Sequence, residues 1–256
     1  MDTGQFQGVA DGGQNRATLE DPTHPDLSKS LSIYDAAHNW RFNLIYHVPN
    51  PIRPDALLGK VLNGWWVGNI VSLQTGYPFL ITQGNNRSGA NVTGAAGADR
   101  PDYGRVAQTM TFGTGSNSST VNFVPYDPKK VITGKPEQWF NPLMFVDAPL
   151  GYLGNVGRNV LRGPGLQNVD ISLNKDTQAK FLGEQGAVQF RAEFFNILNH
   201  PNFAPPNGTV FNGGQTPCQT VPTYSCAVEA PVASAGKITS TKTASRQIQF
   251  ALKLIF

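Results

Sequence analysis

The sequence lacks a long hydrophobic run. None of its segments approaches the roughly 18 consecutive apolar residues that a membrane-spanning helix requires, so a helical membrane protein is excluded. Charge is also scarce, at 14% of residues, and the net charge of +3 comes from lysines and arginines that are scattered along the chain. A nucleic-acid partner is therefore not expected, because such partners need a clustered basic surface.

Enzyme motifs are missing as well. The histidines are dispersed and show no metal-ligand spacing; they are His24, His38, His47 and His200. No Gly-x-Ser-x-Gly elbow is present. The glycines between Gly151 and Gly165 lack the strand–turn–helix context of a phosphate loop. We interpret them as a shaped loop that Arg158 and Arg162 pin, and we expect a protein that is not an enzyme and uses no cofactor.

Cysteine is nearly absent. Cys218 and Cys226 lie in one polar loop. In an oxidising envelope compartment they would form a local disulfide, and two free thiols are the alternative. Neither state implies catalysis, because the spacing is not Cys-x-x-Cys.

A secretory signal is not found at the N-terminus. The segment Met1–Phe6 has neither a charged region nor an apolar one. A chain destined for an outer membrane could not reach it in this form, so on that interpretation we expect a fragment of a longer protein.

What the sequence does contain is turn-forming residues, with 27 glycines and 19 prolines. This composition favours β structure with long loops. Residues 1–37 have the character of a polar loop, and a short helical turn is expected at 56–62. Five segments alternate apolar and polar residues and are expected to be strands; they are 38–48, 65–82, 166–175, 187–198 and 245–256.

The last of these segments shows the alternation most clearly. One face carries only apolar residues, namely Ile248, Phe250, Leu252, Leu254 and Phe256, because side chains alternate with a period of two. A soluble sheet could bury such a face. A tilted transmembrane strand of about 9–11 residues would instead turn it to lipid and its polar face to a wet lumen. Ile45, Trp66, Ile70 and Leu80 interrupt the pattern in the first two segments.

The order of the connections decides between these alternatives. Short links precede the second and fourth strands, and long links, residues 83–164 and 199–241, precede the third and fifth. Short periplasmic turns alternating with long external loops are typical of an outer-membrane barrel. Residues 38–256 are therefore predicted to be antiparallel transmembrane β-barrel strands in an all-β fold. The barrel is incomplete, because closure takes about eight strands.

Several motifs follow one another along the chain: Tyr34-Asp35-Ala36-Ala37-His38, Trp139-Phe140-Asn141-Pro142, residues 157–165, Asp170-Ile171-Ser172-Leu173 and residues 191–203. With them the chain, from Ser32 onward, resembles the C-terminal end of the Oar-like TonB-dependent receptors. These are large outer-membrane proteins with a carboxypeptidase-regulatory-like N-terminal domain, which is absent here.

The resemblance implies a location in the outer membrane, in a barrel of about 22 strands with an internal plug, and transport of substrates across that membrane. The implied partners are outer-membrane lipid, the outer-membrane assembly machinery and an energy-transducing inner-membrane complex. The last would act only through N-terminal parts that this chain lacks.

Polar residues of the third and fourth strands form a candidate lumen wall, namely Asp170, Arg191 and Glu193. We expect Asp170 and Arg191 on one side of neighbouring strands. The alternative function is a soluble or surface β-sandwich that binds carbohydrate or protein, with Trp65, Trp66 and Trp139 as its platform.

The apolar positions of the last strand predict an assembly signal, read by strand pairing. Deleting Phe256 from the full-length protein should then impair insertion more than the roughly 1.5–3 kcal/mol of one buried Phe explains. The measurement is the amount of heat-modifiable protein in outer-membrane fractions. Phe203→Ala, in a loop, is the control, and equal amounts from the wild type and both variants would contradict the signal.

Overall fold

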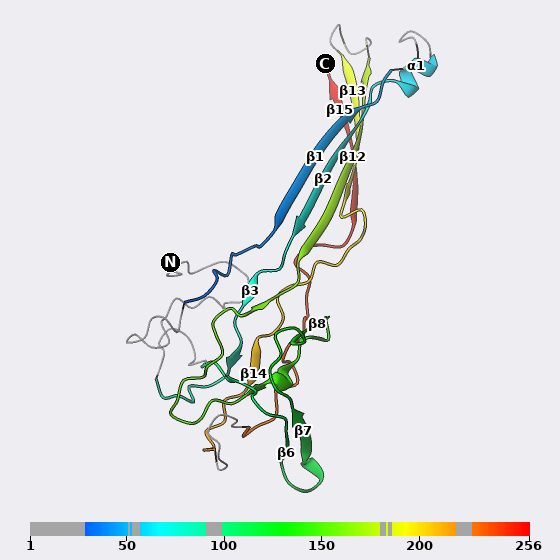
Figure 1. Cartoon of the computed structure of the whole chain (residues 1–256). Helices are drawn as coiled ribbons and strands as arrows, with labels where there is room; N and C mark the ends of the chain where they lie inside the picture. Colours follow the sequence, from blue (N-terminus) through cyan, green and yellow to red (C-terminus); the bar gives the residue numbers. More distant parts are fainter. Residues whose placement is uncertain are drawn as a thin grey trace. The chain divides into compact units, whose positions relative to one another are not determined.

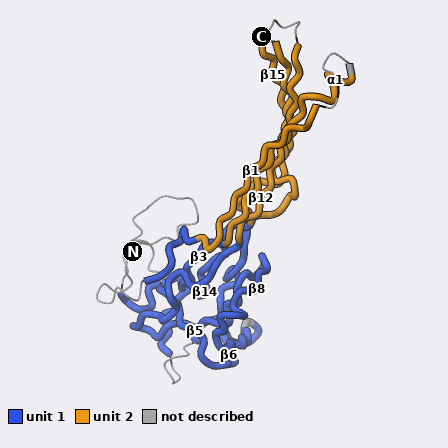
Figure 2. Tube along the Cα trace, turned by 45° about the horizontal axis from the view of Figure 1, so that its top comes forward, with its two compact units in different colours: residues 1–35, 76–164, 203–240 blue, residues 36–75, 165–202, 241–256 orange. Residues whose placement is uncertain are grey.

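The computed structural model describes residues 29–50, 52, 57–90, 99–179, 183, 186–218 and 227–256. The chain divides into two compact units, coloured separately in Figure 2. The loop unit comprises residues 1–35, 76–164 and 203–240, and the sheet unit comprises 36–75, 165–202 and 241–256. Each unit is therefore assembled from segments that lie far apart in the sequence.

The sheet unit contains one sheet of five long antiparallel strands (Figure 1). Its order is β1 (Asn39–His47), β2 (Trp65–Gln74), β12 (Leu166–Gln178), β13 (Ala187–Phe195) and β15 (Gln247–Ile255). Within the described residues the sheet stays open, with β1 and β15 at its edges. The predicted all-β class with five antiparallel strands is confirmed.

The strand bounds differ from expectation at one important place. The second strand ends at Gln74 and does not run on to residue 82. Gly76 explains the break, because its backbone lies so close to Gly163 that a Cβ would come within 1.7 Å of the Gly163 carbonyl oxygen. Beyond it, β3 (Pro78–Phe79) pairs with β11 (Leu161–Arg162), and β4 (Thr82–Gln83) pairs with β14 (Thr209–Phe211).

The other strands differ less: β1 and β15 match their expected bounds to within two residues, and β12 and β13 each differ by three residues at one end. β12 continues to Gln178, past the expected end at residue 175. β13 stops at Phe195 and not at 198, because Asn196 turns the backbone into the left-handed region with φ of 49°. The expected helical turn is present as α1 (Leu57–Leu62). Residues 1–28 of the predicted N-terminal loop lie outside the described residues.

The two segments expected as long loops build the loop unit and give it short pairs of strands. β5 (Asp102–Tyr103) pairs with β10 (Phe145–Val146), β6 (Gln108–Phe112) with β7 (Ser119–Phe123), and β8 (Ile132–Lys135) with β9 (Gln138–Phe140). Among the described residues of this unit, the 3-10 helices η2 (Gly115–Asn117) and η3 (Pro142–Met144) accompany them.

The loop unit also has a hydrophobic core that the sequence pattern did not predict. The rings of Phe79 and Phe145 lie 5.8 and 6.0 Å from that of Phe140. Ile81, Val146, Val156, Val210 and Phe211 are fully buried around them. These residues come from stretches that lie far apart in the sequence, so no single local pattern predicts that they form one core.

Buried charges link three segments of the loop unit. Arg87, 1% exposed, donates from Nη2 to the Thr216 carbonyl at 2.7 Å and from Nη1 to the Gly214 carbonyl. Asp147 is fully buried, and its Oδ2 accepts from the Val228 N–H at 3.1 Å. Burial, together with the nearby Glu229 carboxylate, raises the pKa of Asp147 to about 7.

The raised pKa of Asp147 predicts that the loop unit becomes less stable as pH rises. Its native pKa lies above the ordinary value of 3.8, so the folded state holds the proton more tightly, and folding free energy is lost as pH rises between those values. Asp147→Asn should therefore change stability little at pH near 4 and stabilise the loop unit by about 1–3 kcal/mol near pH 8. Urea unfolding followed by Trp139 fluorescence measures this.

Asp127→Asn, in the same unit, is the matched control for the removal of one carboxylate. A wild-type stability curve that runs parallel to that of Asp147→Asn from pH 4 to pH 8 would contradict the prediction.

Candidate functional site

The register of the five long strands separates two chemically different faces. Asn174 of β12 lies opposite Arg191 of β13, which lies opposite Ala251 of β15. Because side chains alternate along a strand, this row fixes which residues share its side. We call this side the polar face; its polar members include Arg41, Asn43, Ser72, Asp170, Ser172, Asn174, Asp176, Gln189, Arg191, Glu193, Gln249 and Lys253.

The opposite side, the apolar face, carries aromatic and aliphatic residues on every strand. Phe42, Val71 and Val169 form one cross-strand row, and Phe190 stacks on Phe250 with centroids 6.3 Å apart. Many of these side chains are exposed, and Phe250 and Leu252 reach 69% and 67%. A contiguous apolar surface of this kind marks an interaction site or a membrane contact.

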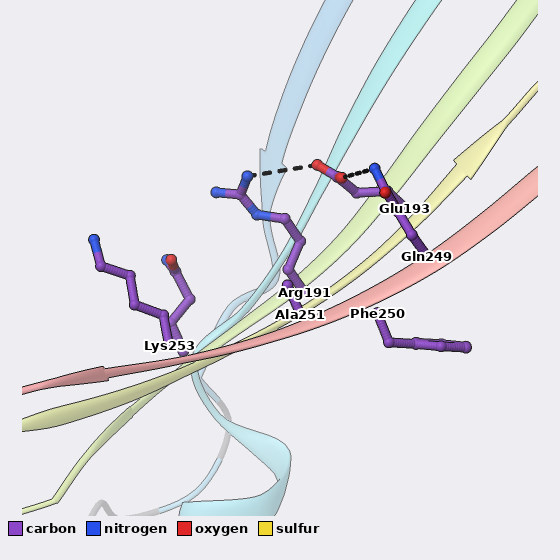
Figure 3. Close-up of a pocket in the computed structure, with 7 residues that line it drawn as sticks. Arg191, Glu193, Gln249, Phe250, Ala251 and Lys253 are labelled. Carbon is purple, nitrogen blue, oxygen red and sulfur yellow. Dashed lines mark hydrogen bonds and ion pairs between the residues drawn. The ribbon is translucent and has the colours of Figure 1, made fainter.

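The predicted lumen-wall residues lie together on the polar face. Glu193 is central, because its Oε1 lies 3.4 Å from Arg191 Nη1 and its Oε2 accepts from Gln249 Nε2 at 2.8 Å (Figure 3). Asp170 shares this face, two same-face positions along β12 from Asn174, the residue opposite Arg191. Its carboxylate accepts from the Asn196 N–H at 2.8 Å, at the end of β13.

The polar face is hollowed in two places. Residues of β13 and β15, including Gln189, Arg191, Glu193 and Lys253, line an open hollow of about 460 Å³. In Figure 3, Phe250 points away from the side to which Arg191, Glu193 and Lys253 project. The second hollow, about 360 Å³, is lined by Ile45, Trp66 and Ile70, among others, beside Asp170 and Ser172. Three of the four residues that interrupt the sequence alternation thus gather in one place, whereas Leu80 belongs to the loop unit.

A hydrogen-bonded row crosses the polar face near the short connections. Asp176 accepts from Trp66 Nε1 at 3.0 Å and from Gln189 Nε2 at 2.8 Å. Gln189 in turn lies opposite Lys253. Carboxylate, amide and ammonium groups from three strands therefore follow one line, an arrangement suited to a water-filled lumen.

No group of three or more metal-ligating side chains occurs among the described residues. None of the helices described there has the length and hydropathy needed to cross a bilayer.

A family model described as an outer membrane beta barrel domain matches residues 1–249. The chain belongs to this outer membrane beta-barrel family. Comparisons with curated proteins and with solved structures find no match. Membership of the family indicates an outer-membrane location and agrees with a sheet that has one apolar and one polar face.

The outer-membrane family does not favour the alternative β-sandwich, and the structure explains why its tryptophan platform fails. Trp65 and Trp66 lie on opposite faces of β2, since neighbouring side chains alternate. Trp139 lies in the other unit and donates from Nε1 to the Arg162 carbonyl at 2.9 Å. The three rings therefore share no surface of one unit.

The remaining predicted positions are placed as follows. Ile248, Phe250, Leu252 and Leu254 lie on the apolar face of β15, and Phe256 follows the strand with 81% exposure. Their role as an assembly signal stays a prediction. Cys226 lies outside the described residues, so its disulfide with Cys218 also stays a prediction.

The glycine-rich loop is held by Arg162, one of the two arginines that the sequence suggested, and the role of Arg158 stays a prediction. Gly151 has a φ of +84°, and a Cβ at Gly154 would lie 1.9 Å from the Arg100 carbonyl oxygen. Arg162 donates from Nη1 to the carbonyls of Asp35 and Gly76, at 2.8 and 3.1 Å, and pairs with the Asp35 carboxylate. Arg162 therefore pins the loop entering β12, and it does so through one of the motifs that carry the family resemblance.

Sequence reasoning missed an asparagine turn that joins three strands of the outer-membrane sheet. Asn196 donates to the His200 and Ala244 carbonyls at 3.0 and 3.3 Å. The Oδ1 of Asn199 accepts from the Arg246 N–H at 3.0 Å, and that of Asn202 from the Gln167 N–H at 2.7 Å. Three asparagines closely spaced after a strand were the available signal, since asparagine tolerates left-handed turns.

This turn predicts a strong and local effect on stability. Asn196 is 4% exposed and has a φ of 49°. Asn196→Ala would leave the backbone groups that its side chain binds without a partner, and it would put alanine, which tolerates the left-handed region less well than asparagine, at this φ, costing about 2–4 kcal/mol. Asn196→Gly should recover the backbone part only. The measurement is the urea midpoint for loss of heat-modifiable migration.

Leu198→Ala is the control in the same turn, since Leu198 is 70% exposed and such changes stay within about 0.5 kcal/mol. Equal midpoints for Asn196→Ala and Leu198→Ala would show that the turn does not hold the strands.

Proposed function

We propose that this chain supplies strands of an Oar-like TonB-dependent receptor that moves substrate across the outer membrane, and that it acts as a transporter segment and not as an enzyme. The observation that carries the proposal is the open five-stranded sheet, with a hollowed, charged polar face on one side and an exposed apolar face on the other. The polar face would line the lumen, and the apolar face would contact outer-membrane lipid.

The exposed apolar face supports this orientation energetically. Burying a side chain such as Phe250 or Leu252 is worth about 1.5–3 kcal/mol, and water covers both in the isolated sheet. Lipid would recover that free energy. Since backbone groups inside a bilayer must all be paired, the edge strands β1 and β15 would join further strands and so complete the barrel.

Transport is supported by the asymmetry of the connections and by the sequence motifs. The links between β1 and β2 and between β12 and β13 are short, whereas those that leave β2 and β13 supply most of the loop unit. A folded unit with its own core on the external side would give a rigid surface for capturing substrate. Energy would come from the inner-membrane complex through other parts of the receptor, and the assembly machinery would insert the strands.

The accessibility of single cysteines tests whether the polar face lines the lumen and the apolar face contacts lipid. In the full-length protein, with Cys218 and Cys226 replaced by serine, we expect Gln249→Cys and Lys253→Cys to react with a water-soluble charged maleimide in outer-membrane vesicles. Phe250→Cys and Leu252→Cys are matched controls on the same strand. They should react only with a lipid-soluble maleimide, because their side chains would lie in hydrocarbon. Equal labelling of neighbouring positions by the charged reagent would contradict the lumen assignment.

The same variants test energised transport in whole cells. If an internal plug is displaced by energy from the inner membrane, the labelling rate of Gln249→Cys should fall when a protonophore collapses the proton gradient. The rate at Val106→Cys, on the exposed surface of the loop unit, should stay constant. An unchanged rate at Gln249→Cys would favour a passive barrel.

A further inference from the structure

The helix α1 presents apolar side chains to its surroundings at one end of the sheet. Leu58, Val61 and Leu62 are 66%, 60% and 48% exposed. The helix is nevertheless held in place, because Trp65 Nε1 donates to the Val61 carbonyl at 2.9 Å and Asn63 Nδ2 donates to the Ile52 carbonyl at 2.6 Å. An apolar surface on a fixed connection calls for a partner that covers it.

This surface continues the apolar face of the sheet. Trp65 and Lys175 are cross-strand neighbours on that face. Lys175 Nζ donates to the Asn63 carbonyl at 2.6 Å and lies 5.4 Å from the centre of the Trp65 ring. Both side chains therefore contact the segment that contains α1, so the C-terminal end of the helix adjoins the end of the apolar face.

Within the described residues 57–62, the one charged side chain of α1 is basic. Lys60 lies in the last turn of the helix, and no acidic residue lies in its first turn. Asp176 follows Lys175 but lies on the polar face, where it accepts hydrogen bonds from Trp66 and Gln189. Tryptophan and lysine concentrate at the headgroup level of membranes, where an apolar stem and a polar tip are both accommodated.

We propose that α1 lies in the headgroup region of the leaflet beside the short connections, as an interfacial anchor that binds anionic phospholipid. Leu58, Val61 and Leu62 enter the boundary of the acyl chains. Lys60 and Lys175 contact the phosphates. A phospholipid surface fits better than a protein partner because the helix surface is continuous with the face that the proposed function turns to lipid. The inference rests on that orientation.

Site-directed fluorescence tests the anchor. The environment-sensitive fluorophore NBD is attached at Leu58→Cys in the full-length protein, with Cys218 and Cys226 replaced by serine. The protein is reconstituted in vesicles of phosphatidylcholine that contain brominated phosphatidylglycerol or, at equal mole fraction, brominated phosphatidylcholine. We expect quenching by both lipids and a clear excess with phosphatidylglycerol. Lys60→Gln with Lys175→Gln should remove that excess, by about fivefold in local enrichment for each lysine.

Matched controls distinguish a failure of the α1 anchor from a failure of the proposed orientation of the sheet. A label at Val106→Cys, an exposed aliphatic position of the loop unit, should not be quenched, and Lys130→Gln should leave the phosphatidylglycerol excess unchanged. A label at Phe250→Cys reports the apolar face itself. Quenching at Phe250 without quenching at Leu58 would overturn the anchor alone, and no quenching at Phe250 would overturn the proposed orientation. Equal quenching by the two lipids at Leu58 would overturn the role of the lysines.

Discussion

The antiparallel register of five strands is the constraint on which the rest of this protein depends. One row, Asn174–Arg191–Ala251, determines which side of the sheet every other side chain occupies, because a shift of one residue would exchange the two faces. The register therefore keeps Glu193 and its hydrogen-bonded neighbours apart from Phe190 and Phe250. An outer-membrane strand sheet needs this separation, since its two faces meet different solvents.

Hydrogen bonds at both ends of the strands hold them in that register. At the end with the long connections, the side chains of Asn196, Asn199 and Asn202 link the end of β13 and the turn after it to the start of β12 and to the chain before β15, through hydrogen bonds to backbone groups. At the other end, the Gly64 carbonyl accepts from the Asp176 N–H at 2.9 Å, beside the helix α1. Polar groups at both ends thus hold strands whose faces contribute little to packing within the isolated sheet.

Much of the sheet could be predicted from sequence, and the loop unit could not. Strands such as 187–195 and 247–255 show their alternation locally, and a period of two needs no partner to be visible. The end of β2 at Gln74 was missed, because the alternation continues to Phe79 and Ile81 although these residues belong to another core. The break depends on the approach of Gly163 to Gly76, which only the folded chain reveals.

The candidate site likewise has features that the sequence predicts and features that only the folded structure shows. The sequence by itself determined that Asp170, Arg191 and Glu193 share a face and that the apolar residues of β15 share the other, because both follow from local periodicity. Only the tertiary structure decided that Glu193 bonds Gln249, that Asp170 accepts from the turn at Asn196, and that Arg162 reaches Asp35. Those contacts join segments distant in sequence, and their partners follow from strand order and chain reversal, which no local pattern encodes.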